Sequence, residues 1–143
     1  MSEVRTSITI AAAPERVWAV LTDFAAYPQW NTVISRVRAE LREGGAIRFK
    51  IKIEGSPELG FAARLVRCAP SRELAWRGGA PLVPALAWGE HYFRLTPAAD
   101  GTQVTHGEHF GGLLRLAVRG SIHARVTRTY ERFNQALKAR AEG

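Results

Sequence analysis

Three side chains that can exchange protons, His91, His106 and Glu108, lie on two neighbouring segments in which polar and apolar residues alternate. Side chains of a strand point alternately to its two faces, and the phase of each segment places all three on the apolar, inward face. The turn sequence Ala98-Ala-Asp-Gly101 joins the segments as a hairpin, in which opposite side chains lie about 4.5–5.5 Å apart. A histidine beside a carboxylate is a usable general acid–base pair, because burial changes the pKa values of both groups.

The same three residues have other interpretations. They are also the residue types of a hydrogen-bonded polar cluster that braces a sheet, or of a group that orients the polar end of a ligand. A single β-bulge would reverse the face to which they point. Two histidines and a carboxylate can ligate zinc or iron, but only strand periodicity supports the spacing here. We therefore expect neither a metal site nor a cofactor.

The elements that would position these residues follow in a simple order. Alternation predicts a strand at residues 6–11; Pro14 then opens a helix, and Asp23 caps a second short helix that Pro28 ends. A period of two predicts six further strands near residues 35–41, 47–54, 59–65, 74–77, 88–96 and 102–110. A long amphipathic helix ends the chain, with an apolar stripe formed by Ile122, Val126, Tyr130, Phe133 and Leu137.

This order predicts an α+β fold in a single domain spanning residues 1–143. Strands that succeed one another through short turns form an antiparallel sheet of seven strands, and each strand has one polar face. The apolar face needs a cover, and the long C-terminal helix is the only large one available. A strongly curved sheet around a helix leaves a space between them, which is where a ligand would bind.

Two N-terminal motifs, Ala13-Pro-Glu-Arg-Val-Trp-Ala-Val-Leu-Thr-Asp23 and Tyr27-Pro-Gln-Trp-Asn31, resemble the START/Bet v 1-like helix-grip superfamily. More narrowly, the chain is similar to the bacterial polyketide cyclase/dehydrase-like (SRPBCC) proteins. Three later segments fit as well: Gly89-Glu-His-Tyr-Phe-Arg-Leu95, Thr105-His-Gly-Glu108 and Phe133-Asn-Gln-Ala-Leu-Lys138. The resemblance implies the helix-grip fold over the whole chain. It also implies lipid, sterol, polyketide or hormone ligands and, in some members, cyclisation or dehydration.

We expect first a protein that binds a small hydrophobic or amphipathic molecule, lipid- or polyketide-like, whose polar end is oriented by His91, His106 and Glu108. The alternative is a cyclase or dehydratase, with His106 or His91 as base and Glu108 as its partner. Trp30 and Asn31, directly after a helix stop, are candidates for the cavity rim. The expected ligand-contacting residues are Tyr27, Trp30, Asn31, Phe49, Phe61, Trp76, His91, Phe93, His106, Glu108, Arg119, Ile122 and Val126.

A third hypothesis rests on charge. The chain has a net charge of +7, and residues 113–143 hold seven basic and two acidic side chains, a net of +5. Such a surface attracts anions, nucleic acid or an acidic membrane. Arg115 and Arg119 project onto the apolar stripe of the last helix, so either the helix begins near Gly120 or both arginines reach the cavity mouth. Residues 81–86 form an apolar, lid-like loop.

Other features narrow the function classes. The single cysteine, Cys68, excludes a disulfide framework and favours a reducing compartment. The chain has no Gly-x-Ser-x-Gly elbow, phosphate-binding loop or dinucleotide fingerprint. It has no apolar run of membrane-spanning length and no apolar stretch directly behind its N-terminus. We expect a cytoplasmic monomer or homodimer with a small hydrophobic ligand, no specific nucleic-acid partner, and a surface compatible with peripheral membrane contact.

Overall fold

The computed structural model describes residues 2–79 and 82–143. The N-terminal half begins with β1 (Ser2–Ile10), α1 (Pro14–Thr22) and the 3₁₀ helix η1 (Phe24–Gln29). The strands that follow are β2 (Ile34–Ala39), β3 (Ala46–Ile51), β4 (Leu59–Ala69), β5 (Glu73–Gly79), β6 (Ala87–Ala98) and β7 (Gly101–Gly112). The chain then forms α2 (Leu114–Ala117) and α3 (Gly120–Glu142). The predicted order of elements is confirmed, and α2 is an addition to it.

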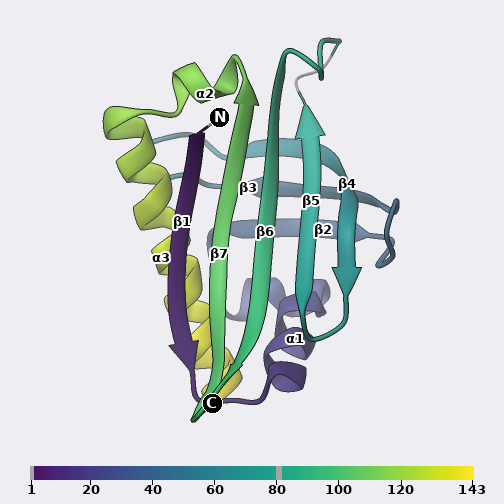
Figure 1. Ribbon diagram of the computed structural model, residues 1–143, viewed down its shortest axis with the longest axis vertical. Coiled ribbons are helices and arrows are strands. Elements are labelled where there is room, and N and C mark those ends of the chain that lie inside the picture. The colour runs from purple at the N-terminus through teal and green to yellow at the C-terminus, as the bar shows by residue number, and fades with distance from the viewer. Residues whose placement is uncertain (1, 80–81) are drawn as a thin grey trace.

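The seven strands form one antiparallel sheet in the order β1-β7-β6-β5-β4-β3-β2. The first strand therefore closes against the last one, while all other neighbours are hairpin partners. Figure 1 shows β1, β7, β6 and β5 running upright in front, with β2 and β3 crossing behind them. The helix α3 runs behind β1 and β7, so the sheet curves around it (Figure 1). This is the predicted helix-grip arrangement.

The second short helix differs from its prediction. It is a 3₁₀ helix that includes Pro28, and the side chain of Asp23 makes no capping hydrogen bond. At the C-terminal end of this helix, the backbone N–H groups of Trp30 and Asn31 donate to the carbonyl of Tyr27. Pro28 has no N–H to donate, and the short 3₁₀ helix is held by bonds on either side of it, from Ala26 N–H to the Asp23 carbonyl and from Trp30 N–H to the Tyr27 carbonyl.

The strand predicted at residues 35–41 is also different. A register shift lies between Ser35 and Arg38, and Arg36 adopts a left-handed backbone conformation with φ 50°. The bulge adds a residue to β2, so strict alternation does not hold along it. Leu41 lies beyond the strand and is exposed rather than facing the core.

The core lies between α3, α1 and the concave face of the sheet. Four members of the predicted α3 stripe are buried: Val126, Tyr130, Phe133 and Leu137. The fifth, Ile122, is 41% exposed, because it sits in the first turn of α3, beyond the part that the sheet covers. The helix starts at Gly120, which leaves Arg115 and Arg119 outside its apolar stripe. Within the described residues, no helix has the length and apolar composition needed to cross a membrane.

Candidate functional site

A buried polar cluster lies between the sheet and α3. In the β6–β7 register His91 stands opposite Glu108, and Phe93 stands opposite His106. His91 Nε2 is 2.8 Å from His106 Nε2, and His91 Nδ1 is 3.3 Å from Glu108 Oε1. The three residues predicted from alternation therefore point inward together, because β6 and β7 pair without a register shift along their whole length.

The other half of the cluster comes from α3. The Tyr130 hydroxyl donates a hydrogen bond to Glu108 Oε1 and lies 3.4 Å from His91 Nδ1. Asn134 Oδ1 is 2.8 Å from His106 Nδ1, and Asn134 Nδ2 donates to Thr6 Oγ1 over 2.8 Å. Strand alternation alone does not place Tyr130, Asn134 or Thr6 in this site. The available signal was the position of Asn134, four residues after Tyr130 on the inward side of the helix.

The hydrogen bonds of this cluster have one consistent direction. Thr6 donates its only hydroxyl hydrogen to the carbonyl oxygen of His106, at 2.7 Å, so it accepts from the amide nitrogen of Asn134. The amide oxygen of Asn134 must then accept, which places a hydrogen on His106 Nδ1. A neutral His106 consequently presents an unprotonated Nε2, and His91 donates its Nε2–H to it.

At the far end of the cluster, this direction turns His91 Nδ1 towards the carboxyl group of Glu108. His91 has used Nε2–H as a donor, so its Nδ1 faces Glu108 Oε1, and the Tyr130 hydroxyl hydrogen is already given to Glu108. His91 Nδ1 and Glu108 Oε1 are therefore neighbours, in an arrangement through which a proton could pass from one group to the other.

Burial differs sharply along the cluster. His106 is 0% exposed and His91 3%, whereas the side chain of Glu108 is 18% exposed. Burial and then the neighbouring His91 lower the pKa of His106 well below its usual value, against the hydrogen bond with Asn134. Burial and then Glu108 raise the pKa of Tyr130 well above its usual value. His106 and Tyr130 are thus neutral at pH 7, and Glu108 is the member that solvent or a ligand reaches.

A line of aromatic rings connects this cluster with the surface. Trp76 stacks on His91 with ring centroids 4.7 Å apart and an interplanar angle of 12°. Phe49 contacts Trp76 at 5.3 Å and stacks on Phe61 at 5.8 Å. Phe61 faces inward opposite Phe49 but is 48% exposed, so the line ends at an uncovered part of the concave face.

Three of the expected ligand contacts lie elsewhere. Tyr27 and Trp30 pack against Phe133, and Tyr27 is buried. Asn31 accepts hydrogen bonds from the backbone of Val33 and Ile34, so its side chain holds the loop before β2 and is not a free rim group. Phe93 and Val126 are buried core residues close to the cluster, while Arg119 and Ile122 are exposed at the start of α3.

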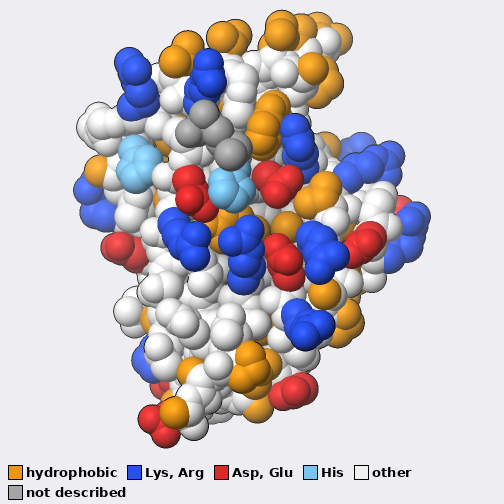
Figure 2. All heavy atoms as spheres, in the orientation of Figure 1, with side chains coloured by type: hydrophobic (Ala, Val, Ile, Leu, Met, Phe, Trp, Pro, Cys, Tyr) orange, Lys and Arg blue, Asp and Glu red, His pale blue; other side chains and the backbone are white. Residues whose placement is uncertain are grey.

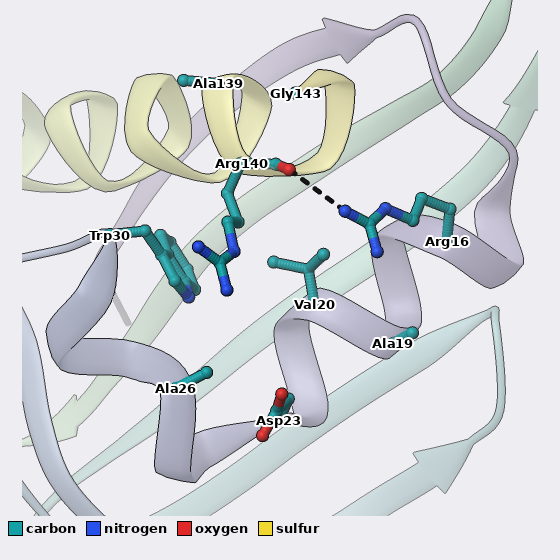
Figure 3. Close-up of a pocket in the computed structure, with 9 residues that line it drawn as sticks. All are labelled: Arg16, Ala19, Val20, Asp23, Ala26, Trp30, Ala139, Arg140 and Gly143. Carbon is teal, nitrogen blue, oxygen red and sulfur yellow. Dashed lines mark hydrogen bonds between the residues drawn. The ribbon is translucent and has the colours of Figure 1, made fainter.

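A hollow of about 450 Å³ lies between α1, η1 and the end of α3 (Figure 3). Its two arginines are occupied: Arg16 donates to the carbonyls of Arg140 and Ala141, both at 3.3 Å, and Arg140 donates to Gln29 at 2.8 Å. They satisfy the last carbonyls of α3 and fix η1, which is a structural role. A second hollow of about 470 Å³ lies beside η1 and β2. Neither is the space predicted between the sheet and α3.

Two further chemistries find no support in the geometry. Among the residues that the structure describes, no three His, Cys, Asp or Glu side chains are grouped so as to hold a metal ion. Burial and then Glu43 raise the pKa of the Cys68 thiol, which makes it a weak nucleophile at neutral pH.

The chain resembles several solved structures over nearly its full length. The aromatase/cyclase Zhui from Streptomyces sp. R1128 has a TM-score of 0.75 and 20% identity, covering 99% of this chain and 93% of that one. The Aha1 dimer from Colwellia psychrerythraea has a TM-score of 0.72 and 21% identity, with 99% and 97% covered. Protein CV1439 from Chromobacterium violaceum has a TM-score of 0.73 and 16% identity, with 100% and 99% covered. At these identities the likeness shows the fold alone.

No curated protein matches the chain. Residues 1–142 match the family described as polyketide cyclase/dehydrase and lipid transport. With the match extending over the sheet, the cluster and α3, the chain belongs to this polyketide cyclase/dehydrase and lipid transport family.

Proposed function

We propose that the protein binds a small, largely apolar molecule between the sheet and α3 and holds its polar end at Glu108. The observation that carries this proposal is an open stretch of the inward apolar surface, connected to the cluster by the aromatic rings. Leu59 and Phe61 face inward opposite Ile51 and Phe49, yet they are 49% and 48% exposed. Ile122 of α3 is half-exposed as well. Apolar surface of this kind suits the body of a hydrophobic ligand.

The chemistry of Glu108 restricts the polar end of that ligand. As a carboxylate it accepts a hydrogen bond from a hydroxyl, and as a carboxylic acid it donates one to a carbonyl. Tyr130 and His91 keep the carboxyl group in one orientation. His106 is too deeply buried to touch a ligand in this geometry. Its role in the proposal is to hold the His91 ring in position through the hydrogen bond between the two Nε2 atoms.

Paired aromatic probes test the proposal. The neutral fluorophore N-phenyl-1-naphthylamine reports binding, and 2-naphthol and 2-methylnaphthalene, which differ by a hydroxyl against a methyl, displace it. We expect 2-naphthol to bind about tenfold or more tightly, because a hydrogen bond to a charged group contributes about 1.5–3 kcal/mol. Glu108→Gln should reduce this preference to below about threefold, since a neutral amide forms a weaker hydrogen bond.

Glu3→Gln is the matched control. Glu3 lies on β1 and binds Tyr92 on the outer face of the sheet, so its loss changes the net charge equally without touching the cluster. Absence of fluorophore binding would refute the proposed site. A hydroxyl preference that survives in Glu108→Gln would refute the role of Glu108.

The contact between His91 and Glu108 supports a second candidate, an acid–base enzyme. An ionised Glu108 that is joined to His91 can remove a proton from a carbon between two carbonyls and pass it to a carbonyl oxygen. Cyclisation of a polyketide chain would require such a step, and one structural neighbour is named an aromatase/cyclase. Hydrogen–deuterium exchange at the central carbon of 1-phenylbutane-1,3-dione, followed by NMR, tests it. We expect exchange above the buffer rate, and we expect Glu108→Gln to reduce the protein-dependent exchange rate by about 10²-fold or more. Exchange at the buffer rate would refute the enzyme and leave ligand binding as the proposed function.

A further inference from the structure

Exposed apolar side chains gather at one end of the molecule. Figure 2 shows them at its upper end, where Figure 1 places the connection between β5 and β6 and the short helix α2. Two segments meet there, because the N–H of Leu113 donates to the carbonyl of Leu86 over 2.6 Å. We call this surface the apolar tip, and it consists of Leu82, Val83, Leu86, Leu113 and Leu116.

The packing of Leu114 keeps the neighbouring leucines of the tip exposed. Leu114 is partly buried and packs against the core, so the neighbouring Leu113 and Leu116 of this short turn point outward. Leu82 is 100% exposed. Five large aliphatic side chains that lie together on a surface are uncommon in a soluble monomer and mark an interaction site. Of the lid-like loop predicted at residues 81–86, Pro81 lies outside the described residues and the remainder belongs to the tip.

The charged side chains that follow the tip along the chain are of one sign. Residues 111–130 contain four arginines and no Asp or Glu, and residues 82–89 contain no charged side chain. Arg128 pairs with Glu54, but Arg115 and Arg119 are exposed and have no ion-pair partner in the described part of the chain. Apolar side chains next to unpaired guanidinium groups suit a phospholipid bilayer, which has a hydrocarbon interior and phosphate groups at its surface.

A second copy of the chain is a poorer occupant. A two-fold dimer would place the same patch on both sides, and the two Arg115–Arg119 pairs would then face one another across the interface. An anionic lipid surface supplies the opposite charge instead. We infer that the apolar tip docks this protein on anionic phospholipid bilayers. The uncovered Leu59 and Phe61 stand at the start of β4, beside the C-terminal end of β5, after which the chain continues to the tip. Docking therefore brings the open interior towards the lipid surface.

Vesicle co-sedimentation tests the inference. The vesicles are POPC alone and an equimolar mixture of POPC and the anionic lipid POPG, in 0.1 M and 0.5 M NaCl. We expect the wild-type protein to bind the POPG vesicles at least tenfold more tightly than POPC, and the higher salt to weaken that binding by screening. Leu82→Asp/Leu116→Asp and Arg115→Glu/Arg119→Glu should each lose at least tenfold in affinity.

Leu41→Asp is the matched control, because Leu41 is an exposed leucine in the turn between β2 and β3, away from the tip. Unchanged thermal midpoints establish that the variants are folded. Binding to neither vesicle, or equal losses in Leu41→Asp, overturns the inference. Self-association that is seen by sedimentation velocity and abolished in Leu82→Asp/Leu116→Asp overturns it in favour of a dimer. Glu108→Gln should bind vesicles like the wild type, so this result is independent of the ligand proposal.

Discussion

His91 Nε2 and His106 Nε2 lie 2.8 Å apart in the space between the sheet and α3, and they share one hydrogen. The hydrogen belongs to His91, because His106 carries its own on Nδ1 for Asn134. A second proton on His106 would leave two donors facing each other in a buried site. The neighbouring His91 ring therefore adds to burial in keeping His106 neutral.

The lowered pKa of His106 predicts a pH-dependent stability. In the unfolded chain a histidine titrates near pH 6.5, whereas the folded protein keeps His106 neutral to lower pH. Below about pH 6.5 the unfolded state thus binds one more proton, and the free energy of unfolding falls as pH falls, by up to about 1.4 kcal/mol per pH unit. Urea unfolding curves between pH 7.5 and 5.0 measure this slope.

Two variants isolate the contribution of His106. His106→Gln keeps a donor and an acceptor but cannot titrate, so its slope between pH 6.5 and 5.0 should be shallower than that of the wild type. His109→Gln removes a half-buried histidine on the outer face, outside the cluster, and serves as the control for the loss of one histidine side chain. Equal slopes in His106→Gln and the wild type would contradict a neutral, buried His106.

Asn134 should be a positioning residue whose loss has a specific signature. Asn134→Leu leaves His106 Nδ1–H and the Thr6 hydroxyl without their partner, and unsatisfied buried groups cost about 1–3 kcal/mol each. The matched change Gln135→Leu, on the exposed side of α3, should cost less than about 0.5 kcal/mol. In ¹⁵N spectra of the wild type, His106 should show the Nδ1–H tautomer. An Nε2–H tautomer would contradict the assigned direction of the hydrogen bonds.

The part of this site that lies on the strands was predictable from the sequence. His91, His106 and Glu108 fall in phase with the apolar residues of β6 and β7, and no bulge interrupts that pair. Alternation fails at Arg36, where a non-glycine residue adopts a positive φ that no local sequence signal announces. For Arg115 and Arg119 the sequence leaves two alternatives, and the start of α3 at Gly120 confirms the one in which both precede the helix.

The partners from other elements were not predictable in the same way. Thr6 and Asn134 are 128 residues apart, and only the packing of α3 against β1 brings their side chains into contact. A polar group after a helix stop has two ordinary uses, a ligand contact or a turn, and the rim position predicted for Asn31 is the first of them. Its bonds to the N–H groups of Val33 and Ile34 show the second.

The two ends of the α3 stripe should respond differently to truncation. Phe133 is fully buried and contacts Tyr27, Trp30 and Phe93, so Phe133→Ala should cost about 3–5 kcal/mol. Ile122→Ala removes a half-exposed side chain and should cost less than about 1 kcal/mol, while it lowers the affinity for N-phenyl-1-naphthylamine. Chemical denaturation and fluorescence titration measure the two effects. A large stability loss in Ile122→Ala would show that this end of the helix is closed core and not part of a binding surface.

Gly89 should control the position of the Glu108 carboxylate. A methyl group on Gly89 would overlap Glu108 Oε2, and the overlapping atom is the end of a flexible side chain that can move. Gly89→Ala should therefore fold, displace the carboxylate from Tyr130 and His91, and reduce the preference for 2-naphthol over 2-methylnaphthalene. Gly60→Ala is the control, because a methyl group there meets nothing closer than Lys50 Cγ at 4.0 Å. If Gly89→Ala changed the His91 ¹⁵N shifts but kept the wild-type preference, Glu108 would not be the group that recognises the hydroxyl; unchanged shifts would contradict the control of the carboxylate by Gly89.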